Sequence, residues 1–374
     1  MVVLFVFLVS LVLGLAQQRA KPFSLAPGNY RIHAYDIVFR ETPFSQFAAA
    51  GIADQSVIGV HSHFAFDYNS KNQLVRVQKI KNGMLDSHSG RWLIAPVTEI
   101  SYNGDKENHI YFNEYGSRTI ANGNVYRSEF QLKEGKRQSL RYFDINGKRI
   151  ANLFAITDYR WHLESDSVLI EERFDREKKA AELRPQIDFY TTRFVFHDNA
   201  LLNYMENWDL QSNRSVANSA GIHRIKISYD QRNYFANWIN LDAHGNKRIG
   251  STGVAEISYT HNQKGEEKRA EFFDGKSQPI ARWGIYQMAY RHDQFGNVIE
   301  TLYLDKAGEK SVRTDGIASR RYEWSADGAY QLRMTTVDRS GNEINHPRLA
   351  YSVYRREISD FLIRDFFLDA DQRR

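Results

Sequence analysis

The chain has no cysteine and only seven prolines in 374 residues, against 23 glycines. Without cysteine there can be no disulfide, no thiolate metal site, no cysteine nucleophile and no lipid-modified N-terminal cysteine. So little proline argues against a proline-rich disordered chain. A chain of this length can bury a large core without disulfides, so the absence of cysteine is compatible with export.

The sequence also lacks a block of charge of one sign. Fifty Lys and Arg residues offset 45 Asp and Glu residues, and the two signs are interspersed, as in residues 171–179. Nucleic-acid binding usually requires a clustered basic face. The pattern therefore predicts a solvated surface and no nucleic-acid partner.

Common catalytic motifs are missing as well. There is no Gly-x-Ser-x-Gly elbow, no phosphate-binding Gly-x-x-x-x-Gly-Lys loop and no His-Glu-x-x-His helix. The adjacent carboxylates Glu171-Glu172 and Glu266-Glu267 would point to opposite faces of a strand, so neither pair can flank one glycosidic bond. We expect both pairs to be solvated, and the sequence favours a non-enzymatic protein without a cofactor.

The residues that most resemble a metal site are His61, His63 and Asp67. A His-x-His pair on a strand places both imidazoles on one face, where a carboxylate could complete a site. Zinc sites usually have at least three protein ligands, and the sequence offers no further candidate nearby. We therefore predict no metal site and favour packing or surface roles for these histidines.

No apolar run is long enough to cross a bilayer as a helix. Residues 2–16 are apolar apart from Ser10 and Gly14, but a spanning helix needs about 20 residues. Gly14 and Ala16 stand where a signal peptidase requires small residues. We predict a signal peptide over residues 1–16, cleaved after Ala16, and a periplasmic or secreted protein. An uncleaved anchor is the alternative and would be the chain's contact with a membrane.

What the sequence does contain is a repeat. From about residue 60, a turn-forming Asn or Asp recurs every 31–34 residues, at Asn82, Asn113, Asp144, Asp175, Asp209, Asp242, Asp274, Asp305, Asp338 and Asp369. A second series is in phase with it, at Gly221, Gly253, Gly284 and Gly316. Asp at the start of a turn binds the backbone two residues on, which favours a turn role over a calcium site.

Each repeat has the pattern of a β-hairpin. Tyr286, Met288 and Tyr290 alternate with other residues as in a half-buried strand, residues 295–297 form a turn, and Asp305-x-x-Gly308 forms the next. About ten units would give about 20 strands, which an open sheet cannot hold flat. We predict an all-β fold of tandem β-hairpin repeats. The repeats would form a curled or twisted antiparallel sheet, a β-solenoid-like superhelix, or two packed sheets.

The two ends match the repeat less well. Residues 17–60 fit it poorly and are predicted to be an N-terminal cap, because repeat arrays need an atypical terminal unit. Thr42-Pro43 favours the start of a short helix within the cap. The array itself is predicted over residues 61–374, with a helical turn at 178–183. Its end is either a truncated unit or a short amphipathic cap at 355–367.

The paired turns at residues 292–297 and 303–308 resemble those of bacterial tyrosine–aspartate (YD/RHS-like) hairpin repeats. The resemblance covers roughly residues 60–370 and rests on turn and aromatic positions. It implies an extracytoplasmic β scaffold and no particular activity.

Recurring aromatic residues could form a stacking platform for sugars or peptides, or pack in the core, which we favour: Tyr259, Trp283, Tyr290, Tyr322 and Trp324. The function predicted is binding or scaffolding at the cell envelope, through an extended surface that contacts a protein or an envelope polymer. One alternative is an envelope glycan-active enzyme whose carboxylates are brought together by the curl. Another is a purely structural spacer.

Overall fold

The computed structural model describes residues 19–87, 95–121, 123–198, 200–346, 351–359 and 362–369. Apart from one helical turn, α1 (Gln55–Ile58), and one 3-10 turn, η1 (Pro43–Ser45), its regular elements are strands. They are β1 (Tyr30–Ile37), β2 (Ala49–Ala53), β3 (His63–Tyr68), β4 (Leu74–Lys81), β5 (Met84–Leu85), β6 (Val97–Asn103), β7 (Lys106–Phe112), β8 (Arg127–Lys133), β9 (Lys136–Phe143), β10 (Arg149–Ile150), β11 (Asp158–Ser165), β12 (Val168–Phe174), β13 (Thr191–Phe196), β14 (Leu202–Asp209), β15 (Arg214–Ser215), β16 (Arg224–Tyr229), β17 (Phe235–Leu241), β18 (Glu256–His261), β19 (Glu267–Phe273), β20 (Gln287–His292), β21 (Val298–Leu304), β22 (Ser319–Trp324), β23 (Gln331–Val337), β24 (Val353–Ser359) and β25 (Leu362–Leu368).

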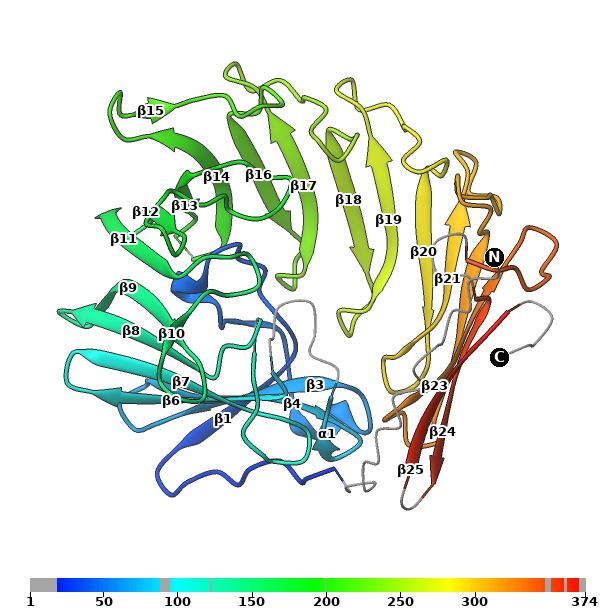
Figure 1. Ribbon diagram of the computed structural model, residues 1–374, viewed down its shortest axis with the longest axis horizontal. Coiled ribbons are helices and arrows are strands. Elements are labelled where there is room, and N and C mark those ends of the chain that lie inside the picture. Colours follow the sequence, from blue (N-terminus) through cyan, green and yellow to red (C-terminus); the bar gives the residue numbers. More distant parts are fainter. Residues whose placement is uncertain are drawn as a thin grey trace, which may run out of the picture.

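All 25 strands belong to one sheet, and every strand pairing is antiparallel. Successive hairpins pair side by side, while β2 lies outside β1 at one edge and β25 lies at the other. The sheet curls strongly, so that β1, β3 and β4 come back towards the later strands (Figure 1). The predicted all-β hairpin-repeat fold with a curled sheet is confirmed.

The Asp and Asn positions of the repeat form the predicted turns. Asp305 accepts hydrogen bonds from the backbone N–H groups of Ala307 and Glu309, both at 2.9 Å. Asp175 makes the same two bonds at 2.8 and 2.9 Å, although its unit lacks the glycine. Lys178 takes the left-handed conformation (φ +65°) in place of that glycine. The helical turn predicted at 178–183 is therefore wrong, because this unit keeps the same turn as its neighbours.

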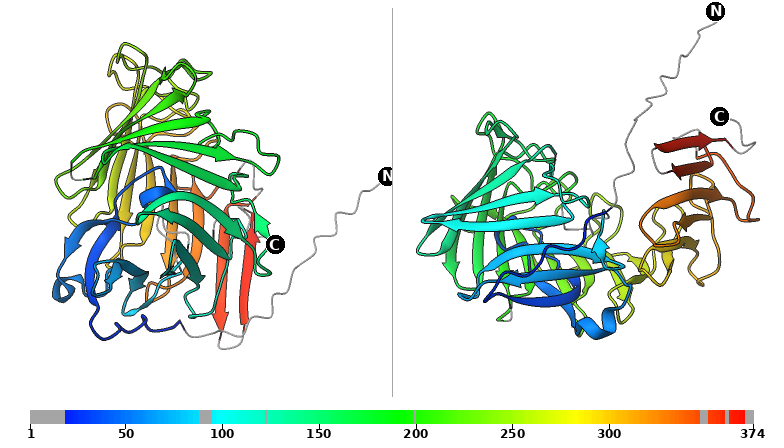
Figure 2. Two further views of the ribbon diagram at one scale, coloured as in Figure 1. Left: turned by 90° about the vertical axis from the view of Figure 1, so that its left-hand side faces the viewer. Right: turned by 90° about the horizontal axis from the view of Figure 1, so that it is seen from below.

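The C-terminal part of the chain is a further hairpin. Residues 355–367 lie in β24 and β25, which pair with each other and extend the sheet beyond β23 (Figure 2). The amphipathic cap proposed for this segment is thus replaced by a repeat hairpin. The predicted signal peptide, residues 1–16, lies outside the described residues, and the boundary near residue 60 stays a prediction. Among the residues that the structure describes, no helix is long and apolar enough to cross a membrane.

A loop from the N-terminal region fills part of the curl. Residues 38–48, which we call the plug, connect β1 to β2 and pack against the inner face of the sheet. Phe39, 2% exposed, lies 4.4 Å from the ring of Phe235, and Phe44 lies 5.4 Å from Trp161. The plug contains η1, whose N-cap Thr42 accepts a hydrogen bond from Phe44 N. The short helix predicted here is confirmed as a single 3-10 turn.

Buried charges hold the plug in place. Glu171, fully buried, accepts hydrogen bonds from Trp161 Nε1 at 2.8 Å and from Thr42 and Arg173. Its predicted solvation is wrong, because the curl turns this strand face inward and supplies three donors. Arg137 of β9 donates to the Phe44 carbonyl at 2.5 Å. The plug is therefore fixed by polar contacts as well as by aromatic packing.

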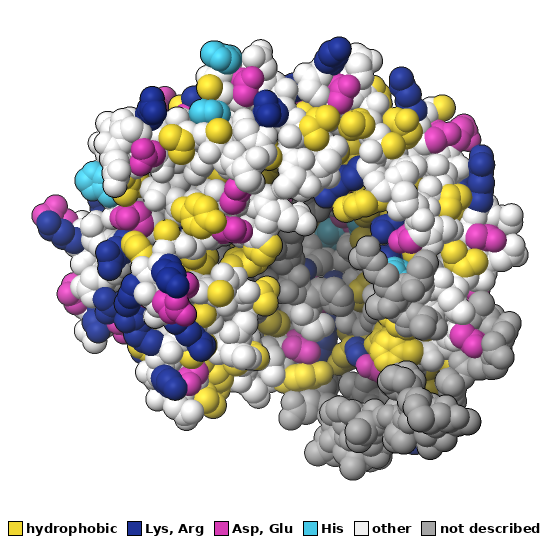
Figure 3. Space-filling model, turned by 45° about the horizontal axis from the view of Figure 1, so that its top comes forward, with side chains coloured by type: hydrophobic (Ala, Val, Ile, Leu, Met, Phe, Trp, Pro, Cys, Tyr) yellow, Lys and Arg dark blue, Asp and Glu magenta, His cyan; other side chains and the backbone are white. Residues whose placement is uncertain are grey.

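The outer surface is of mixed charge, as predicted. Figure 3 shows Lys and Arg side chains interspersed with Asp and Glu side chains over one face of the molecule.

Candidate functional site

Four successive hairpin turns lie in a row at one end of the sheet: 230–233, 262–265, 293–296 and 325–328. The N-terminal part of the chain, from β2 to the turn between β4 and β5, crosses this row. It contacts each of the four turns or the residue directly after it. We call this line of contact the seam.

The first contact involves β2. Gly51 N donates to Arg232 O at 2.9 Å, and the buried Tyr234 packs beneath it. A Cβ at Gly51 would lie 1.8 Å from the hydroxyl of Tyr234, and a Cβ at Gly265 would lie 2.7 Å from its ring. Both glycines have positive φ, Gly51 within β2 and Gly265 in a hairpin turn, and both make room for Tyr234.

The next contacts come from His61 and Ser62. His61 Nε2 donates to Glu266 Oε1 at 2.8 Å, and its Nδ1 faces the Ser62 carbonyl at 2.7 Å. Ser62 N donates to Phe295 O at 3.0 Å, and a Cβ at Gly296 would lie 2.9 Å from the His61 ring.

The last contact is a buried lysine. Lys81, 2% exposed, donates to Asn297 Oδ1 at 2.6 Å and lies 3.3 Å from Asp86. Burial lowers the pKa of Lys81, while Asp86 acts in the opposite direction. Asn297 in turn donates to the Gly328 carbonyl at 3.1 Å. The seam therefore joins segments 181 to 247 residues apart through a series of polar contacts.

His61, His63 and Asp67 do not come together as metal ligands. Asp67 forms a two-bond ion pair with Arg31, at 2.6 and 2.9 Å. His63 Nδ1 donates to the His61 carbonyl at 3.0 Å, and burial lowers the pKa of His63 to about 4. Within the described parts of the chain, no three His, Asp or Glu side chains form a group suited to a metal ion.

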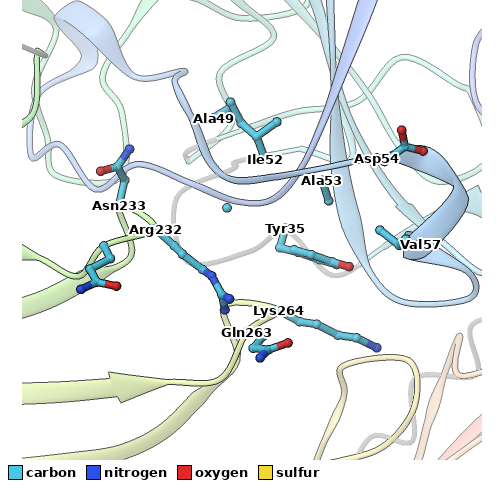
Figure 4. Close-up of a pocket in the computed structure, with 12 residues that line it drawn as sticks. Tyr35, Ala49, Ile52, Ala53, Asp54, Val57, Arg232, Asn233, Gln263 and Lys264 are labelled. Atoms are coloured by element: carbon cyan, nitrogen blue, oxygen red, sulfur yellow. The ribbon is translucent and has the colours of Figure 1, made fainter.

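Two adjoining hollows open along the seam and share Tyr35 and Lys264. The larger, which we call the seam groove, has a volume of about 690 Å³ and lies between β2, α1 and the first two turns (Figure 4). The smaller, which we call the histidine pocket, has a volume of about 220 Å³ and is lined by His61, His261 and His292 among others.

The histidine pocket holds its best-placed carboxylate in the ionised form. Burial alone would raise the pKa of Glu266, but the hydrogen bond from His61, the charge of His292 and the hydrogen bond from Asn262 bring it below its ordinary value. Burial also lowers the pKa of His292. A carboxylate held in this way is a poor general acid, since a general acid needs a raised pKa. The pair Glu266-Glu267 is half-buried, so its predicted full solvation is wrong.

The seam groove combines exposed apolar side chains with cations. Ile52 and Val57 are 71% and 63% exposed. Arg232 and Lys264 come from neighbouring turns on the opposite side, as Figure 4 shows. The one acidic residue of the lining, Asp54, caps α1 by accepting a hydrogen bond from Ser56 N at 2.8 Å. The groove thus presents apolar surface beside positive charge.

The predicted aromatic platform is only partly assembled. Tyr259 pairs with Ala270, and Ala270 pairs with Met288, which lies two residues before Tyr290 in the same strand. Tyr259 and Tyr290 therefore lie on the same face of the sheet, and both are half-buried. Trp283 is 47% exposed in a turn, where Arg282 lies 3.9 Å from its ring. Sequence reasoning missed the residues of the seam groove, because isolated turn residues carry no signal that they will meet a distant strand.

No protein-family model matches the chain, and no curated protein matches it. Solved structures with some likeness include the TcdB2-TccC3 complex, at 8% identity and a TM-score of 0.23, with 82% of this chain and 20% of that chain covered. A porin-like protein from Bacteroides uniformis shows 10% identity and a TM-score of 0.18, with 92% of this chain and 96% of that chain covered. The chain spans about a fifth of the TcdB2-TccC3 chain that it matches. We assign no family from scores this low.

Proposed function

We propose that this chain is an exported, non-enzymatic β-repeat protein that binds a protein or an envelope polymer at the cell envelope. The observation that carries the proposal is the seam groove. It is open, lined by exposed Ile52 and Val57 together with Arg232 and Lys264, and lies between β2, α1 and two hairpin turns. Extended surfaces of repeat proteins commonly serve binding.

Export rests on the short apolar run of residues 2–16, which is followed by a small-residue cleavage pattern at Gly14 and Ala16. The resemblance of the repeat to hairpin arrays of extracytoplasmic proteins supports the same location. Cell fractionation tests this part directly: mature chain beginning at Gln17 is expected in the envelope or medium, and full-length chain in the cytosol would contradict it.

An envelope glycan-active enzyme is the second candidate, because the curl brings Glu266, Glu267 and Asp36 to one pocket. The lowered pKa of Glu266 and its bond to His61 favour a structural role for this carboxylate instead. A glycosidase needs one protonated carboxylic acid beside the bond that it cleaves. Release of reducing sugar from isolated envelope polymer by the purified chain would support this candidate.

A retention experiment tests binding by the seam groove. Tagged full-length protein is incubated with the solubilised envelope fraction, and the retained components are compared with those of the double variant Arg232→Glu/Lys264→Glu. The matched control is Lys276→Glu/Lys306→Glu, two exposed lysines in turns at the opposite end of the strands. We expect a component that wild type and control retain and the groove variant loses. Identical retention by all three proteins would refute the proposal.

A further inference from the structure

We propose that the seam groove binds an extended, acidic segment of another polypeptide, which pairs with the edge of β2 at Ala53, beyond the contact of Gly51 with turn 230–233. This inference rests on the proposed binding function and names its partner class. It starts from the place of β2 in the sheet: among the strands of the described residues, β2 pairs with β1 alone, so its other side is a sheet edge. Such edges are ready templates for a further strand.

The register of β1 and β2 identifies the backbone groups that face this edge. Val38 N donates to Ala48 O at 2.8 Å, and the pairs Asp36↔Ala50 and Ala34↔Ile52 continue that hydrogen-bonded series. In an antiparallel ladder the intervening residues direct their N–H and C=O groups outward.

Gly51 agrees with this assignment, because its N–H reaches outward to Arg232 O. The next outward residue is Ala53, which belongs to the lining of the seam groove. The bond to Arg232 occupies the edge at Gly51, so the groove offers the main-chain groups of Ala53 to an extended segment laid along it.

The side chains around this edge define the chemistry of the added strand. Ile52, at 71% exposure, and Val57, at 63%, offer apolar contacts beside β2. Burying such side chains against apolar residues of a partner contributes about 25 cal/mol per Å² of apolar surface removed from water. A partner strand that alternates apolar and polar residues would cover them.

Charge selects the polar residues of that strand. Arg232 and Lys264 face the groove from two neighbouring turns, while Asp54 is engaged at the N-terminus of α1. The complementary ligand is acidic. A polypeptide fits better than an anionic polysaccharide, because a sugar chain would leave the outward backbone groups of Ala53 and the exposed Ile52 unused.

A designed peptide tests the proposal. The probe is a fluorescein-labelled Glu-Val-Glu-Ile-Glu-Val-Glu peptide, titrated with full-length protein at low salt and followed by fluorescence anisotropy. We expect saturable binding to wild type and to the control Lys276→Glu/Lys306→Glu. Arg232→Glu/Lys264→Glu should bind roughly tenfold more weakly or worse. A probe with lysine in place of every glutamate should bind the groove variant more tightly than it binds wild type.

A second variant separates strand pairing from charge alone. Ala53→Pro removes an outward N–H but no hydrogen bond to β1, and proline is tolerated at such an edge position. We expect it to keep the wild-type melting temperature and to bind the acidic probe roughly tenfold more weakly. A probe with alternate backbone amides N-methylated should likewise bind poorly to wild type. Equal binding of the methylated probe would overturn the strand-pairing proposal.

Failure of this inference is distinguishable from failure of the proposed function. If sodium alginate, a polyanionic polysaccharide, binds with the same dependence on Arg232 and Lys264 while the peptide does not, the partner class is wrong and groove binding stands. If neither probe binds and the envelope retention experiment also shows no difference, both proposals fail.

Discussion

Glu107 gives the sharpest test of how the plug is held. This buried residue of β7 accepts hydrogen bonds from Arg137 Nε at 2.9 Å and from His109 Nε2 at 2.6 Å. Arg137 also donates to the carbonyl of Phe44 in the plug at 2.5 Å. Glu107 therefore orients the cation that fixes the plug. Glu107→Gln should weaken the ion pair with Arg137 and, through it, the contact between Arg137 and the plug.

The magnitude follows from the pKa of Glu107. Burial alone would raise this pKa, but the hydrogen bonds from His109 and Arg137 lower it from 4.5 to about 2. That difference corresponds to about 3 kcal/mol of stability. Because the folded-state pKa is depressed, the contribution is complete above about pH 5 and is lost as the pH falls towards 2. About 2 kcal/mol of it should be gone at pH 3.

Urea denaturation between pH 7 and pH 3, followed by tryptophan fluorescence, measures this contribution. At pH 7 Glu107→Gln should be about 3 kcal/mol less stable than wild type, and the gap should narrow to about 1 kcal/mol at pH 3. Glu177→Gln, at a residue whose side chain is 70% exposed, is the control and should follow wild type throughout. A gap between wild type and Glu107→Gln that stays constant with pH would refute the ion-pair account of the plug.

The remaining predictions concern stability at other sites. Arg173→Met leaves the buried Glu171 without its cation and should lower the free energy of unfolding by about 3–5 kcal/mol, whereas Glu171→Leu/Arg173→Met should recover part of that loss. Gly51→Ala should cost about 2–4 kcal/mol, because it combines positive φ with a clash on Tyr234. Gly245→Ala, with positive φ and open space around it, should cost only about 1–2 kcal/mol. Denaturation midpoints check all four variants, and equal costs at the two glycines would contradict the clash.

The repeat could be predicted from sequence because its signals are local. Asp305 and Gly308 determine a turn within four residues, and alternation at Tyr286, Met288 and Tyr290 specifies a strand within five. Antiparallel hairpins joined by short turns then leave few ways to arrange the sheet. The predicted number of strands also indicated that the sheet curls, since a flat sheet of that width is unfavourable.

The candidate site could not be predicted, because it depends on which residues the curl brings together. His61 looked like half of a metal pair with His63, yet its partner is Glu266, 205 residues away. Glu171 looked like a solvated carboxylate, and only the inward face of the curl accounts for its burial. Arg232 and Lys264 are ordinary turn residues until β2 lies opposite them. Contacts between residues this far apart in the chain produce no periodic pattern in a single sequence.

The seam also constrains the order of events during synthesis. Lys81 reaches the Gly328 carbonyl, 247 positions later in the chain, at 3.4 Å. At about 5–20 residues per second, a ribosome takes about 12–50 s to make the intervening chain. During that interval Lys81 lacks the last turn that it contacts in the finished protein, and β2 lacks its own contact until Arg232 has been made. A holding chaperone would protect the chain through this window, and the last hairpins would complete the fold of the first.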